Sequence, residues 1–148
     1  PVLGSGFFCP VCRRSHVAKV IKELSEHDEM NVFGLPVTAE MAPTYFDVIR
    51  TPMDLQTMSE KAARGEYKSL QPVREDVELM CLNAATFNRT GDRIWRESCR
   101  FFHAATETLE GFAQATHASV SSAFPSSQAS SSARQSAPTL KTQRQTLR

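Results

Sequence analysis

The segment between residues 31 and 53 places the strongest constraint on how this chain folds. Glycine and three prolines interrupt it, and it shows no sustained period. It nevertheless carries many large apolar residues, namely Phe33, Leu35, Val37, Met41, Tyr45, Phe46, Val48 and Ile49. A connection this long inside a compact domain is usually functional or disordered, and this one has too much apolar surface for a solvated linker. We therefore expect it to pack on a helical body, with a short helical turn between Pro43 and Ile49.

On both sides of this segment, apolar residues recur at spacings of three and four, the pattern of amphipathic helices. The first predicted helix starts at an N-cap at Ser15 and ends near Met30. The second follows an N-cap at Asp54 and stops at Gly65. Their inward faces are Val17, Val20, Ile21 and Leu24, and then Leu55, Met58 and Ala62.

Two more helices are predicted in the second half of the chain. A cap at Ser69 starts the third, and Pro72 falls in its first turn, where no backbone donor is needed. The fourth begins after Asp92 and runs to about Phe112. The inward faces are Val73, Val77, Met80, Cys81, Ala84 and Phe87, and then Ile94, Ser98, Phe101 or Phe102, Ala105, Leu109 and Phe112. The sequence therefore predicts an all-α fold.

Charge is unevenly distributed along the chain. All 16 acidic residues lie between Glu23 and Glu110, whereas residues 17–112 hold only 11 Lys and Arg, a balance of −5. An acidic body favours a cationic partner and argues against nucleic acid as its main ligand. A solvated helical surface without partner preference would show the same pattern. No apolar run is long enough to span a membrane, no signal-peptide pattern leads the chain, and four irregularly spaced cysteines are typical of reduced thiols in an intracellular protein.

The two ends differ from the helical part. Cys9 and Cys12 form a Cys-x-x-Cys pair, which is half of a tetrahedral zinc site. His16 could add a third ligand, but no fourth is evident. With the aromatic Phe7, the pair resembles the closing edge of a PHD-type zinc finger whose other ligands would lie upstream; a metal-free leader is the alternative. We expect residues 1–14 to form a leader, with zinc at Cys9 and Cys12 only if upstream ligands are present and no other cofactor.

The C-terminal end is rich in Ser, Ala, Gln and Thr from about residue 119. Such a segment buries too little apolar area to offset the entropy lost on ordering. We therefore expect a disordered tail at residues 119–148 and a folded domain at residues 15–118.

A candidate binding group lies where the third helix runs out onto a polar loop. Asn88 carries a carboxamide with two donors and an acceptor, the aromatic Phe87 precedes it, and the apolar pair Ile94 and Trp95 follows the loop. A carboxamide at the mouth of an apolar slot suits a neutral amide ligand. On local sequence alone, Asn88 is also a good helix C-cap. Asn83, one turn earlier, is interpreted as structural, with its amide reaching the backbone of the long segment.

Several motifs resemble those of bromodomains, the modules that read acetyl-lysine. The resemblance covers about residues 15–112 and rests on Pro36-Val37, the run from Ala42 to Leu55, the turn from Gly65 to Leu70, and the run from Asn83 to Asn88, all in family order at near-family spacing. It implies a left-handed four-helix bundle with a long loop between the first two helices. It also implies a non-catalytic protein.

The resemblance assigns site residues position by position. Asn88 matches the anchor for the acetyl carbonyl, and Tyr45 matches the tyrosine that holds the same oxygen through a water. The apolar positions match as follows: Phe33 cushions the acetyl methyl, Val37 and Phe87 are walls, and Ile94 is the gatekeeper. Leu35 and Met41 either line the pocket or pin the loop.

The chain also departs from the family pattern. Phe87 stands where many members have tyrosine, and Thr44 replaces a common aspartate. Asn31 and Val32 occupy the place of a Trp-Pro shelf that some members have, which puts peptide preference in doubt.

The resemblance implies a nuclear protein that binds acetylated lysine in histone tails or other chromatin proteins. We expect it to be a monomer, with no nucleic acid bound directly by the bundle and no membrane partner. The alternative is a helical docking module with a degenerate pocket. An enzyme is disfavoured, because Cys81 and Cys99 lie within apolar helices and lack an evident base.

Overall fold

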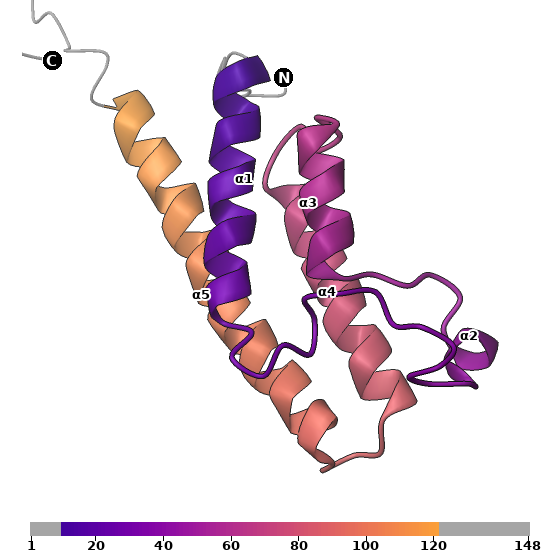
Figure 1. The fold of residues 1–148 in the computed structure, drawn as a ribbon. Helices are drawn as coiled ribbons and strands as arrows, with labels where there is room; N and C mark the ends of the chain where they lie inside the picture. The colour runs from indigo at the N-terminus through magenta and orange to yellow at the C-terminus, as the bar shows by residue number, and fades with distance from the viewer. Residues whose placement is uncertain (1–9, 122–148) are drawn as a thin grey trace, which may run out of the picture.

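The computed structural model describes residues 10–121, with side chains described as far as residue 115. Within this range the chain is helical and contains no strand. Figure 1 shows the four longer helices packed side by side, with the shortest helix projecting from the long loop. The helices are α1 (Pro10–Glu26), α2 (Tyr45–Val48), α3 (Leu55–Ala63), α4 (Gln71–Phe87) and α5 (Arg93–Ser121). The predicted all-α, four-helix bundle and the short turn around Pro43 to Ile49 are confirmed.

The predicted helical stripes form the core. All four inward residues of α1 are buried, and so are those of α3. In α5 the choice between two phenylalanines is settled, because Phe101 is fully buried whereas Phe102 is 39% exposed. Ile94, predicted on the inward face, is instead 38% exposed. It lies in the first turn of α5, beyond the part of this helix that packs into the core.

Two predicted helix starts are wrong. α1 begins at Pro10, so Ser15 lies inside the helix and caps nothing. Proline is well suited to the first turn of a helix, since its missing N–H has no partner there in any case. The N-cap of α4 is Leu70 rather than Ser69, and no side chain caps this helix.

The helix ends also differ from prediction. α1 stops at Glu26 rather than near Met30, and a turn follows in which Asn31 adopts a positive φ of 50°. α5 continues to Ser121, so the first residues of the predicted tail are helical. Residues 122–148, which make up the rest of that tail, lie outside the described residues.

The capping of α3 follows the sequence prediction closely. The Asp54 carboxylate accepts from the Thr57 N–H at 2.8 Å and from the Thr57 hydroxyl at 2.6 Å. At the other end, Gly65 has a φ of 72° and donates to the Ala62 carbonyl, and the Glu66 N–H donates to Lys61. This pair of bonds is a Schellman motif.

Gly65→Ala should lower the free energy of unfolding by about 1–2 kcal/mol, because an L side chain is strained at this φ. The new Cβ would also lie 2.6 Å from Nε of Arg14. The matched control is Gly111→Ala, which has open space around it inside α5 and should stabilise by about 0.5–1 kcal/mol. Thermal denaturation of both variants tests this. A loss of stability at both positions, or at neither, would contradict the interpretation.

The long loop is held against the bundle by three backbone attachments. The Asp28 carboxylate accepts from the N–H groups of Val32 and Phe33, each at 2.8 Å. The Phe33 carbonyl accepts from the Leu55 N–H at 2.8 Å, at the start of α3. The Asn83 amide donates to the Thr51 carbonyl at 2.8 Å, which confirms the structural role predicted for Asn83. The segment therefore packs on the bundle as expected through its buried residues Phe33, Tyr45 and Ile49, but its other large apolar side chains are not all covered.

Polar networks tie the helices together elsewhere. The His27 imidazole hydrogen-bonds Thr108 at 2.9 Å, and Arg100 donates to the His27 carbonyl at 2.6 Å while pairing with the buried Glu97. These contacts join the end of α1 to α5. Between α3 and α4, the buried Asp76 accepts from Lys61 and from the Tyr67 hydroxyl, each at 2.5 Å. No helix within residues 10–121 combines the length and the apolar character needed to cross a membrane.

Candidate functional site

Tyr45 brings the long loop to the end of α4. Its ring is only 5% exposed, and it packs edge-on against Phe87 with ring centroids 5.1 Å apart. Burial, together with the nearby Asp54 carboxylate, raises the pKa of the Tyr45 hydroxyl above its ordinary value of 10. The hydroxyl is therefore protonated at neutral pH and can donate as well as accept a hydrogen bond.

Asn88 is the C-cap residue of α4 and has extended backbone. Its Nδ2 donates to the Ala84 carbonyl at 2.8 Å, so the capping role allowed by the local sequence is present. Because a carbonyl can only accept, this bond fixes which end of the amide faces the helix. One N–H and the carbonyl oxygen of the side chain make no hydrogen bond to another described residue, and the side chain is half-buried. The amide can thus cap the helix and meet a ligand at the same time.

Phe33 lies deeper than the other predicted pocket residues. It is 4% exposed and belongs to the hydrophobic core, where its ring lies 4.8 Å from that of Phe101. The backbone bonds to Asp28 and Leu55 fix its position. An aromatic ring fixed in this way can form the floor of a pocket but contributes little open surface.

The remaining predicted site residues lie closer to solvent. Val37 is half-buried, Ile94 is 38% exposed, and Leu35 and Met41 are 61% and 73% exposed. Phe46 and Val48 of α2 are also largely exposed. The sequence placed Phe46 and Val48 among the apolar residues of the loop but gave no sign that they would face solvent. The long loop therefore presents Leu35, Met41, Phe46 and Val48 to solvent.

Cys81 is poorly suited to act as a nucleophile. Burial, with a smaller effect from Cys99, raises the pKa of Cys81 to about 12. The nucleophilic thiolate form is therefore scarce at neutral pH. Cys12 and Cys99 are exposed.

The predicted metal pair is only partly within the described residues. Cys9 lies outside them, and Cys12 lies in the first turn of α1. Among the side chains described, those of residues 10–115, no group of three or more His, Cys, Asp or Glu could hold a metal ion. These residues alone do not fit a complete zinc site, and the zinc prediction still depends on ligands elsewhere.

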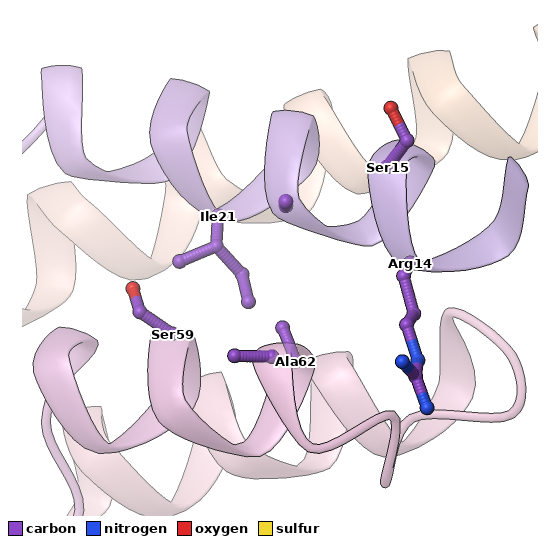
Figure 2. A pocket seen from close by; sticks show the side chains of 7 residues that line it. Arg14, Ser15, Ile21, Ser59 and Ala62 are labelled. Carbon is purple, nitrogen blue, oxygen red and sulfur yellow. The ribbon is translucent and has the colours of Figure 1, made fainter. Parts of the chain in front are cut away.

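A hollow of about 310 Å³ lies between α1 and α3, apart from the predicted site residues. Figure 2 shows Ile21 and Ala62 facing into it, with the Arg14 side chain reaching from α1 toward the chain that follows α3. Its lining is Arg14, Ser15, Ala18, Ile21, Ser59, Ala62 and Ala63. The sequence gave no indication of this hollow, because it forms only where small residues of two helices meet.

Residues 17–100 match the model of the bromodomain family, which is more than half of the chain. The chain belongs to the bromodomain family. Bromodomains are non-catalytic modules that read acetylated lysine, and this bromodomain has their helical bundle. The matched range includes all eight predicted ligand-binding residues.

Proteins similar to this bromodomain include bromodomain-containing protein 9 of Xenopus tropicalis, at 39% identity over 83 residues. That match covers 56% of this chain and 14% of the relative. Bromodomain-containing protein 7 of Gallus gallus is 31% identical over 91 residues, covering 62% and 14%. The chain therefore spans a small part of the length of these relatives.

A solved structure of a hypothetical bromodomain from Trypanosoma brucei, in complex with bromosporine, is also similar. The TM-score is 0.64 at 26% identity, with 67% of this chain and 86% of that chain covered. A Trypanosoma cruzi bromodomain has a TM-score of 0.63 at 24% identity and supports the fold alone.

Proposed function

We propose that this bromodomain binds acetylated lysine in histone tails or other chromatin proteins, as a nuclear monomer, with Asn88 as the anchor of the acetyl carbonyl. The observation that carries the proposal is the orientation of the Asn88 amide. Its bond to Ala84 leaves one N–H unused at a half-buried position next to Phe87, in a chain whose family reads acetyl-lysine.

The surrounding side chains favour a neutral ligand. Burying an ammonium group without a paired carboxylate is strongly unfavourable, whereas acetylation converts the group to an amide with a methyl. Phe33, Val37, Phe87 and Ile94 would contact the methyl and the aliphatic stem. Tyr45 would hold the carbonyl through a retained water, which is enthalpically nearly as good as a direct bond. Leu35 and Met41, both exposed, would contact the peptide outside the pocket. Rejection of charge is then the main source of discrimination.

Asn88→Ala should weaken binding of an acetylated peptide by about 1–3 kcal/mol, the cost of leaving a buried carbonyl unsatisfied. Calorimetric titration of the folded variant measures the loss. Because the substitution also removes a helix cap, its thermal stability must be measured in parallel.

The matched control is Gln71→Ala, which removes an exposed carboxamide from the opposite end of α4. Its affinity for the peptide should equal that of the wild type. Unchanged binding in Asn88→Ala would contradict the anchor assignment.

A second candidate function is docking of a protein partner by a bundle whose pocket no longer binds acetyl-lysine. The exposure of Leu35, Met41 and Phe46 favours it, since these side chains form contact surface outside the proposed pocket. A folded domain that fails to bind any acetylated peptide would support this candidate over the first.

A further inference from the structure

Three exposed arginines adjoin the proposed pocket. Arg89 directly follows Asn88 in the sequence, and Arg93 directly precedes Ile94, so each is the chain neighbour of a residue assigned to the site. Arg96 lies three residues after Arg93, a spacing that puts two side chains on neighbouring parts of one helix face. Arg89 lies in the loop that joins α4 to α5, and Arg93 and Arg96 lie in the first turn of α5; Figure 1 shows this loop at one end of the bundle. We call Arg89, Arg93 and Arg96 the arginine rim.

The arginine rim has no ion-pair partner among the described residues. In the part of the chain that the structure describes, no carboxylate lies within ion-pair distance of any of the three guanidinium groups. By contrast, Arg64 pairs with Glu66, and Arg100 pairs with the buried Glu97.

The sequence from residue 88 to residue 96 contains one further charged group, the exposed Asp92, so its net charge is +2. This sign is opposite to the balance of −5 over residues 17–112. The charge of the whole domain therefore does not describe the charge beside the pocket.

The backbone that carries the rim is ordered by local hydrogen bonds. The Asp92 N–H donates to the Arg89 carbonyl at 3.0 Å, and the Arg96 N–H donates to the Asp92 carbonyl at 2.9 Å. The guanidinium groups thus extend from fixed positions. Their planar donor geometry matches a carboxylate, which can accept two parallel hydrogen bonds from one arginine.

We propose that the arginine rim selects acetylated peptides in which aspartate or glutamate lies beside the acetyl-lysine. This inference rests on the proposed function of the pocket. A lysine inserted between Asn88 and Ile94 brings its neighbours close to Arg89 and Arg93, where acidic side chains are attracted and basic side chains are repelled. The excess negative charge of the rest of the domain disfavours a nucleic acid, whose phosphates extend well beyond one rim.

The test uses three peptides of equal length in which the residues beside one acetyl-lysine are acidic, neutral or basic, each with its unacetylated counterpart. In titrations of the wild type, affinity for the acetylated peptides should fall from the acidic to the neutral to the basic one. The acidic and basic peptides should differ by about three- to tenfold in affinity, since exposed charge pairs are individually weak. The difference should shrink as salt is raised.

Substitution locates the effect. Arg89→Gln, Arg93→Gln and Arg96→Gln combined should bring the three affinities within about twofold of one another, and Arg93→Gln alone should do so in part. Because all three side chains are exposed, the combined variant should keep the circular dichroism spectrum of the wild type. The matched control is Lys22→Gln, which removes an exposed positive charge from α1 and should leave the ranking unchanged.

Equal affinity for the three acetylated peptides would overturn the rim inference and leave the reader function intact. Absence of acetyl-dependent binding by any peptide would overturn both. A ranking that survives the combined substitution would show that another surface senses the charge. If duplex DNA displaces the peptide from the wild type, and the combined variant no longer binds DNA, the rim is a nucleic-acid site instead.

Discussion

Phe101→Ala is expected to lower the free energy of unfolding by about 3–5 kcal/mol, the usual cost of emptying a fully buried aromatic position. The Phe101 side chain has no exposed surface and its ring lies 4.8 Å from that of Phe33. Truncation would therefore leave a cavity directly beneath the proposed pocket floor. Urea denaturation followed by circular dichroism measures the loss.

Phe102→Ala is the matched control for this prediction. Phe102 is 39% exposed, so its truncation should lower the free energy of unfolding by less than about 1 kcal/mol. Similar losses at the two positions, or a larger one at Phe102, would mean that α5 presents a different face to the core.

Asp28→Ala is expected to destabilise the domain by about 2–4 kcal/mol. The carboxylate is only 8% exposed and accepts from two backbone N–H groups, those of Val32 and Phe33. Hydrogen bonds to charged groups are among the stronger ones, and their loss would leave the buried Phe33 donor unsatisfied. Because these bonds also position Phe33, peptide affinity should fall together with stability.

Glu26→Ala provides the comparison, since Glu26 is an exposed acidic residue at the end of α1. Its effect on stability should stay within about 0.5 kcal/mol. Denaturation of both variants at the same pH distinguishes the loop attachment from a general effect of removing negative charge. Equal effects would show that Asp28 does not hold the loop.

Local sequence patterns predicted the parts of the fold that depend on local physics. The stripes of α1 and α3, the Asp54 cap and the Gly65 stop each follow from helical spacing or from one residue's backbone preference. The link from Asn83 to the long loop was also predicted, although it joins residues far apart in sequence. Apart from the Asn83 link, these features require no knowledge of which helices become neighbours.

The features that were missed depend on tertiary contacts or on weak local signals. Ser69 has a side chain suited to capping, yet the helix starts one residue later. The role of Asp28 could not be predicted, because its two partners lie in the turn that its own bonds create. The contact of Arg100 with His27 was missed because the two residues lie far apart in sequence. Its pairing with Glu97 was missed because the sequence did not indicate that Glu97 would be buried.

For the candidate site, the sequence named residues but did not predict how exposed each of them would be, and their binding roles stay predictions. Asn88 caps the helix, as its local sequence allowed, whereas its role as a ligand anchor stays a prediction. Ile94 is more exposed than helical periodicity suggested, and Phe33 belongs to the core although its segment has no period that could predict this. The net negative charge of the whole domain did not indicate the positive charge of the residues next to the site.

Titration of the wild-type domain with one lysine peptide in acetylated and unmodified forms tests the central claim most directly. We expect binding of the acetylated form, with at least about tenfold weaker binding of the unmodified form, because burying the ammonium group is unfavourable. Equal affinity for the two forms, or tighter binding of the unmodified peptide, would contradict the account of this pocket.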